Sequence, residues 1–169
     1  DMAIDVRFDN TGDDPVDVAI PFGTLVVTDD EGDQTMAVNP PDDPEAIEVA
    51  ADGGTPTVEV PVGDSEETLP VYCTELGDSY PFTETPVTPI DQASDELVTV
   101  LRAGFVDNAS HYDVQGAVWW LTDEPSLPVG GIEADLLRDV DVEAFAADPH
   151  RVIPDTGYTP LWMRDEGSN

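Results

Sequence analysis

Lysine is absent from this sequence, and all five basic residues are arginine, against 38 aspartate and glutamate residues. The formal net charge is therefore −33 over 169 residues. So few cations cannot form a basic patch, which excludes the usual electrostatic footprint of a nucleic-acid-binding protein. Without lysine, an intramolecular lysine–asparagine isopeptide crosslink is also impossible. The sequence further lacks an apolar run long enough to cross a membrane as a helix.

Cysteine and histidine are almost as scarce. The single cysteine, Cys73, excludes an internal disulfide framework. The two histidines, His111 and His150, have no partners at the spacing of a zinc site. The acidic run at 29–33 does not match a calcium-binding loop, and we interpret it as solvated acid. We therefore expect neither a metal nor a cofactor.

The acidic residues recur along the whole chain rather than in one tail. Hydrophobic residues make up 40% of the sequence in regular patterns, so we expect a folded domain rather than an acidic disordered segment. Dispersed acid without lysine resembles the composition of proteins from extreme halophiles. In molar salt the Debye length is about 3 Å, which screens the repulsion between carboxylates. At low salt the same repulsion destabilises the compact state.

The first half of the chain has the alternation expected of β-strands. Ile4, Val6 and Phe8 share one side of the first run, and short apolar runs follow between glycine, proline and aspartate. A turn is predicted at 63–67 and a proline-rich link at 80–91. Short strands at this spacing predict an antiparallel β-sandwich. The expected strands are MAIDVRFDN, VDVAIPF, GTLVVT, QTMAV, AIEVA, TPTVEVPV and TLPVYCTEL.

A helical period replaces this alternation after the link. Ser94 is a predicted N-cap, and the segment YDVQGAVWWLTDE, after a connector DNASH, predicts a second helix on which Gln115 and Trp119 lie on the same side. A third, shorter helix is expected within GGIEADLLRDVDVEAFAADPH. The apolar stripe of the first helix contains Leu97, Val100, Leu101 and Phe105.

These patterns predict an α+β fold that is mainly β, with a sandwich followed by two or three short helices packed on it. The sandwich portion is expected at 1–90, the helical portion at 91–147 and an irregular C-terminal segment at 148–169. We expect the three portions to form one folding unit.

Cys73 and Gln115 are the first candidates for chemistry. A thiolate held against a glutamine carboxamide can displace ammonia and form an internal thioester, which is a masked electrophile. This chemistry needs an unpaired cysteine, an ordered glutamine and a pocket poor in water. The alternative is purely structural, because cysteine is among the residues most often buried and a helical glutamine commonly bonds to the backbone.

The segments YDVQGAVWWLTD and VYCTELG resemble the glutamine and cysteine motifs of the thioester domains of bacterial surface adhesins. With IPFGTLV and TVEVPV, they also resemble secreted bacterial β-rich domains of unknown function. The resemblance implies a Cys73–Gln115 thioester, with Tyr72 and Trp119 shielding the pocket. Thr74 and Val114 depart from the residues that the adhesin family prefers at those positions.

Two further readings concern other residues. His111 and Asp113 are candidates, with Cys73, for a thiol-hydrolase set, although a carboxylate only two residues along the chain does not by itself orient an imidazole. Asn108 begins an Asn-Ala-Ser sequon and is a candidate for glycosylation in an extracytoplasmic protein.

The expected function is that of a non-enzymatic, extracellular surface or adhesion module of a halophile, which binds other protein chains or surface ligands. One alternative is a structural subunit of an extracellular filament, surface layer or virion, able to form a homo-oligomer or polymer through strand edges. The other is a cysteine-dependent hydrolase.

Overall fold

The computed structural model describes residues 2–28, 34–75, 85–122 and 135–140. The predicted acidic run at 29–33, His150 and the expected irregular segment at 148–169 lie outside the described residues. In chain order, the elements are β1 (Ala3–Asn10), β2 (Val16–Ala19), β3 (Thr24–Thr28), β4 (Met36–Val38), α1 (Pro44–Ala51), β5 (Thr57–Val60), β6 (Gly63–Cys73), β7 (Val87–Gln92), α2 (Asp95–Val106) and α3 (His111–Thr122).

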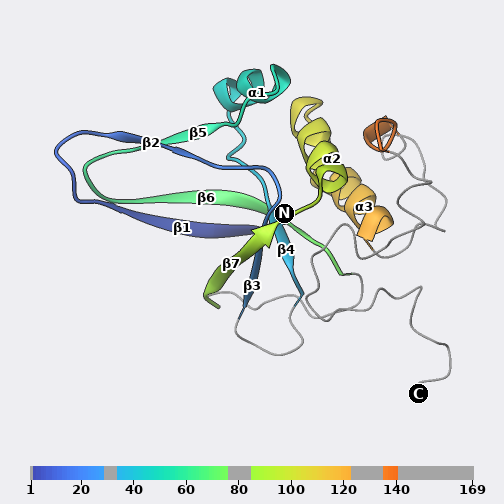
Figure 1. Cartoon of the computed structure of the whole chain (residues 1–169), viewed down its shortest axis with the longest axis horizontal. Helices are drawn as coiled ribbons and strands as arrows, with labels where there is room; N and C mark the ends of the chain where they lie inside the picture. Colours follow the sequence, from blue (N-terminus) through green and yellow to red (C-terminus); the bar gives the residue numbers. More distant parts are fainter. Residues whose placement is uncertain (1, 29–33, 76–84, 123–134, 141–169) are drawn as a thin grey trace.

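The strands form a five-stranded antiparallel sheet in the order β1-β6-β4-β3-β7 and a two-stranded ribbon of β2 and β5. Figure 1 shows β1 and β6 as two long neighbours, with the ribbon above them and the helices to the right. The mainly β, α+β fold class is confirmed. The sandwich stays a prediction, because the described strands form one sheet and one ribbon.

Strand β6 joins the two halves of the sheet. Its first part pairs with β1, from Gly63 opposite Asn10 to Pro70 opposite Ala3. Its last three residues pair with β4 on the other side, and Cys73 lies opposite Met36. The end of β6 therefore lies where the long β1–β6 pair meets the part of the sheet that packs against the helices.

Side-chain alternation gives the sheet two apolar faces. One face meets the helices, in a cluster that includes Leu25, Ala37, Tyr72, Leu97, Leu101, Val118 and Leu121, which we name the helix-side cluster. The other face forms a cluster of Ile20, Val26, Met36, Val38, Leu69, Val71 and Cys73, which we name the thiol-side cluster. Consecutive residues of β6 therefore project into different clusters, with Tyr72 on the helix side and Cys73 on the thiol side.

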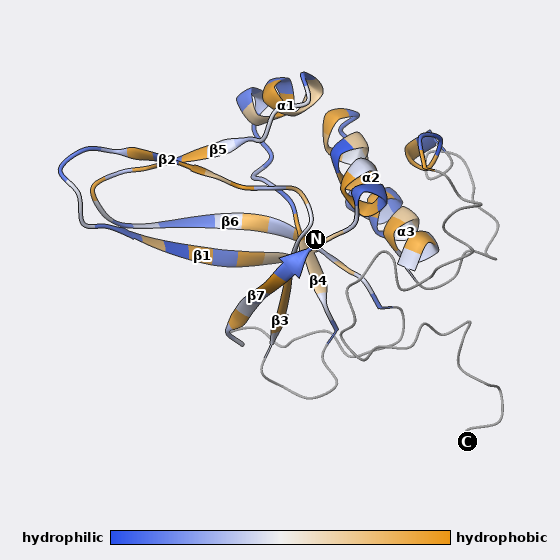
Figure 2. Cartoon of the chain, in the orientation of Figure 1, coloured by the Kyte–Doolittle hydropathy of each residue, from blue (hydrophilic) through white to orange (hydrophobic). Residues whose placement is uncertain are grey.

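Several local predictions agree with the structure. The side chains of Ile4, Val6 and Phe8 pack against the thiol-side cluster, and Figure 2 shows the corresponding alternation of hydropathy along β1. Ser94 is the N-cap of α2, and its hydroxyl accepts a hydrogen bond from the amide of Leu97. The predicted stripe of α2 is buried.

Helices α2 and α3 approach each other closely at a glycine. A Cβ atom added at Gly104 would lie only 2.5 Å from a methyl group of Val114. A larger residue at this position would push the two helices apart. The close approach fixes α3 against the end of β6, where the candidate site lies.

Three local predictions are wrong. The run AIEVA forms part of α1 rather than a strand, because Asp43 caps the helix through bonds to two amides and Pro44 begins its first turn. The segment 63–67 is strand rather than turn, since it pairs with β1 and turns its acids to solvent. The expected link contains β7, an edge strand that tolerates Pro89 opposite a register shift in β3.

Candidate functional site

The structure brings Gln115 of α3 against the main chain of Cys73 at the end of β6. The amide of Cys73 donates a hydrogen bond to Oε1 of Gln115 at 2.9 Å. Nε2 of Gln115 donates to the carbonyl oxygen of Cys73 at 2.8 Å. Both side chains are buried, with exposed fractions of 4% for Gln115 and 2% for Cys73. One carboxamide thus satisfies both main-chain polar groups of a buried residue.

Within the described residues, the pairing of β1 with β6 does not extend to Cys73. In the described residues, β1 begins at Ala3, and the last bond on its side of β6 runs from the amide of Val71 to the carbonyl of Met2. The next residue of β6 that faces this side is Cys73, beyond the described end of the strand. Gln115 supplies to both main-chain groups of Cys73 the hydrogen bonds that a neighbouring strand would otherwise make.

The thiol of Cys73 points away from α2 and into the thiol-side cluster. Its sulfur lies 3.5 Å from the sulfur of Met2. Burial, followed by the charge of Glu75, raises the pKa of this thiol to about 12. The thiol therefore stays protonated at neutral pH, which removes the thiolate that nucleophilic chemistry requires.

The two predicted shielding residues lie on different sides of this contact. Trp119 follows Gln115 by one helical turn and packs against the thiol-side cluster. Tyr72 projects into the helix-side cluster, where its ring stacks on His111 with centroids 4.7 Å apart. Trp120 also packs into the helix-side cluster, so the two adjacent tryptophans contact different clusters.

The three residues of the hydrolase hypothesis do not converge. His111 stacks on Tyr72, and burial lowers the pKa of its imidazole. The carboxylate of Asp113 accepts a hydrogen bond from the hydroxyl of Ser110, which in turn accepts one from the amide of Asp113. This pair belongs to the start of α3 and leaves His111 without an orienting carboxylate from that residue.

Asn108 lies exposed in the connector between α2 and α3, with a positive φ of 50°. An asparagine tolerates this left-handed conformation better than most residues. Its side chain lines a pocket of about 240 Å³ together with Asn39, Asp42, Tyr72 and His111. Sequence reasoning missed Asn39 and Asp42, which stand in a loop without any motif.

Within the described ranges, no group of three or more histidine, cysteine, aspartate or glutamate side chains is arranged to hold a metal ion. No described helix is both long and apolar enough to cross a membrane. In comparisons with known proteins, no family model, no curated protein and no solved structure matches this chain.

Proposed function

We propose that this domain is a non-enzymatic, extracellular surface module of a halophile, in which Gln115 and Cys73 form a structural clamp. The observation that carries the proposal is the pair of hydrogen bonds, at 2.9 and 2.8 Å, between the carboxamide and the Cys73 main chain. These bonds account for a glutamine among the buried residues of α3. They use both polar ends of the side chain and leave the thiol to the apolar cluster.

The non-enzymatic part of the proposal is supported by the state of the thiol. Cys73 is 2% exposed, and burial raises the pKa of its thiol to about 12. A cysteine hydrolase needs a thiolate within reach of a general base. Iodoacetamide at pH 8 in high salt is therefore expected to leave Cys73 unmodified until the protein is denatured. Rapid alkylation of the folded protein would contradict the clamp and favour a reactive thiol.

The halophilic part is supported by charge. The chain carries a net charge of −33, and the ion pairs Arg7–Glu66, Arg138–Asp107 and Arg138–Asp139 all lie on exposed side chains. Repulsion between the remaining acids is therefore balanced mainly by dissolved ions. Circular dichroism is expected to show a folded domain in molar sodium chloride and cooperative unfolding on dialysis to low salt. A fold that is equally stable at both salt concentrations would contradict this part of the proposal.

The adhesion role rests on the resemblance of VYCTELG and YDVQGAVWWLTD to adhesin thioester domains. A second candidate function therefore keeps the thioester, and the contact of the Gln115 carboxamide with the Cys73 main chain favours it by placing the two residues side by side. In that reaction the Cys73 sulfur attacks Cδ of Gln115, the C–N bond breaks, and ammonia leaves with the thiol proton. The product loses the bond from Nε2 to the Cys73 carbonyl.

An intact mass of protein purified in high salt separates the two candidates. The clamp predicts the full sequence mass and no addition of hydroxylamine. A thioester predicts a mass short by one ammonia and a hydroxylamine adduct at Gln115.

The open edges of the sheet favour a third candidate, a structural subunit of an extracellular assembly. Strands β1 and β7 are the edges of the five-stranded sheet, and Ile90 of β7 is 43% exposed. Exposed edges can pair with another chain. A size series in high salt tests this candidate, since a concentration-dependent polymer supports it and a persistent monomer contradicts it.

A further inference from the structure

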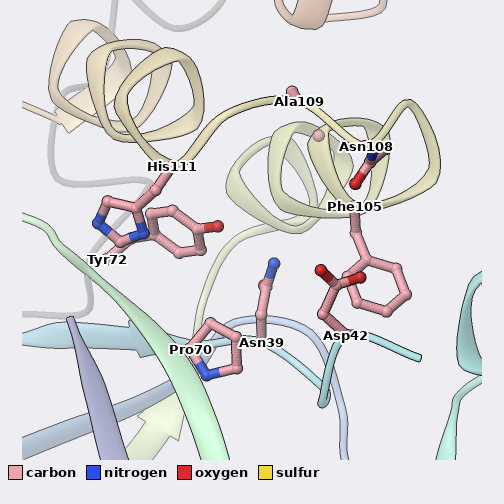
Figure 3. Close-up of a pocket in the computed structure, with 9 residues that line it drawn as sticks. Asn39, Asp42, Pro70, Tyr72, Phe105, Asn108, Ala109 and His111 are labelled. Atoms are coloured by element: carbon pink, nitrogen blue, oxygen red, sulfur yellow. The ribbon is translucent and has the colours of Figure 1, made fainter. Parts of the chain in front are cut away.

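A pocket of about 240 Å³ lies on the helix side of the sheet, across β6 from the thiol of Cys73. Its floor comes from β6 and the loop after β4, and its rim comes from the connector between α2 and α3. Figure 3 shows Asn39, Asp42 and the hydroxyl of Tyr72 pointing into the same space, below Asn108. The pocket therefore gathers polar side chains from three separate parts of the chain.

Asn39 is the unusual member of this group. Its side chain is 2% exposed, yet its oxygen has no hydrogen-bond partner among the described residues. A buried carbonyl oxygen without a partner lowers the stability of the fold, and such groups are rare in folded proteins. Gln34 and Trp119 also have a buried atom without a partner in the described ranges, but neither lines the pocket. Asn39 therefore lines the pocket with a carboxamide whose oxygen is not held by another described group, and Figure 3 shows its amide nitrogen directed toward the space.

The other walls supply mixed polar and apolar surface. Asp42 is exposed at the mouth and provides acceptors, and Tyr72 provides a hydroxyl. Burial, and then the charge of Asp42, raises the pKa of this hydroxyl to about 12, so it remains a donor at neutral pH. Pro70 and the ring of Phe105 add apolar surface beside these groups. A ligand must therefore offer several donors and acceptors together with a small apolar face.

We infer that this pocket binds a sugar ring through Asn39, Asp42 and Tyr72. Each hydroxyl of a sugar donates and accepts, which matches carboxamide, carboxylate and phenol groups placed side by side. The C–H face of the ring suits the apolar wall, and the pocket volume suits one ring rather than a longer ligand. An organic cation fits less well, because Asp42 is one exposed carboxylate among 38 acidic residues and molar salt screens its charge.

The inference stands on the pocket and does not depend on the Gln115–Cys73 clamp, because neither Gln115 nor Cys73 lines the pocket. If the domain is an adhesion module, the sugar is the terminal residue of a surface glycan. If it is not, the sugar is a free monosaccharide. Titrating both free monosaccharides and their methyl glycosides distinguishes the two sources, since a terminal glycan residue tolerates a substituent at the anomeric carbon.

The test is a titration of the isotope-labelled full chain, in high salt, followed by NMR. The probes are glucose, galactose, mannose and N-acetylglucosamine, with their methyl glycosides, and n-butylammonium chloride represents the organic cation. At least one sugar is expected to give saturable shifts at the side-chain amide of Asn39 and the ring of Tyr72. Absence of saturable shifts with every sugar, or equal shifts with butylammonium, would overturn the inference.

Two substitutions, each of which removes one exposed carboxylate, provide a matched pair for the titration. Asp42→Asn changes an exposed residue and is expected to weaken the bound sugar by roughly tenfold or more, because a charge-assisted hydrogen bond is lost. Asp9→Asn removes the same charge from the exposed face of β1 and is expected to change nothing. Equal effects of the two would show a general charge effect and contradict the inference.

Asn39→Leu tests the buried oxygen directly. The side chains are similar in size, so the substitution is expected to abolish the sugar-induced shifts at Tyr72 while the salt-dependent unfolding midpoint stays the same or improves. Unchanged sugar binding in this variant would overturn the inference. So would loss of stability, since it would show that the carboxamide is part of the fold.

Discussion

Two buried carboxamides lie near the end of β6, and their hydrogen bonding differs. Gln115 is 4% exposed, and each end of its carboxamide bonds to the main chain of Cys73. Asn39 is 2% exposed, and its oxygen has no partner among the described residues. A satisfied buried amide stabilises a fold, whereas an unsatisfied one lowers its stability. On this contrast we assign Gln115 to the stability of the fold and Asn39 to the proposed sugar pocket.

The largest expected effect follows from removing the satisfied amide. Gln115→Ala leaves the buried amide and carbonyl of Cys73 without partners and is expected to lower the free energy of unfolding by about 2–5 kcal/mol. Urea unfolding in high salt measures this loss. A change within a few tenths of a kcal/mol would show that the two bonds do not hold α3 to β6.

Gln115→Glu is the matched variant, because it keeps the shape and removes only the donor to the Cys73 carbonyl. Burial raises the pKa of a carboxyl group at this position, and the protonated form can donate again. Relative to the wild type at each pH, the variant is therefore expected to be less destabilised at pH 5 than at pH 8. A deficit that grows toward low pH would contradict this account.

A smaller loss is expected on the thiol side. Cys73→Ser places a hydroxyl beside Met2 in the thiol-side cluster and is expected to cost about 1–3 kcal/mol. Cys73→Ala removes the polar atom and serves as the control for lost volume. Denaturant unfolding of both variants measures the difference, and a serine variant more stable than the alanine variant would mean that the thiol site is polar.

Asn39→Leu is expected to change stability in the opposite direction to Gln115→Ala. Removing an unsatisfied buried oxygen and adding apolar volume is expected to raise the free energy of unfolding by up to about 1 kcal/mol. The pair of measurements sharpens the comparison, since both variants lose a buried carboxamide. A loss of more than about 1 kcal/mol in Asn39→Leu would show that the Asn39 carboxamide, like that of Gln115, stabilises the fold.

The smallest effect is expected at the surface. Nε of Arg7 lies 2.8 Å from the carboxylate of Glu66, but the Arg7 side chain is 85% exposed. Exposed ion pairs contribute little and are screened by salt. Arg7→Gln is therefore expected to leave the unfolding midpoint in molar salt unchanged, and a clear drop there would indicate a role beyond this pair.

Much of the local structure was predictable from the sequence. The alternation of Ile4, Val6 and Phe8 and the stripe that follows Ser94 are strong periodic signals, and the structure confirms both. The misassigned segments carried conflicting signals. AIEVA is short and apolar, and its helix depends on the Asp43 cap. The acids at 63–67 suit a turn by composition, but they form a strand because β1 supplies a partner.

The residues of the two candidate sites also differ in how far the sequence pointed to them. Cys73 and Gln115 stood out because each is rare in its surroundings, and a motif resemblance joined them. Nothing in the sequence indicated that Gln115 bonds to the main chain of Cys73, since this depends on how α3 packs against the end of β6. Asn39 and Asp42 lie in a loop, and their place beside Tyr72 follows from long-range pairing of β4 with β6. Local patterns carry no information about such contacts.

The most direct test of the clamp is the intact mass of the chain, purified in molar salt and measured with and without hydroxylamine. The clamp keeps the Gln115 carboxamide intact, so we predict the full sequence mass and no adduct. A mass short by one ammonia, with hydroxylamine added at Gln115, would contradict the clamp and establish a Cys73–Gln115 thioester instead.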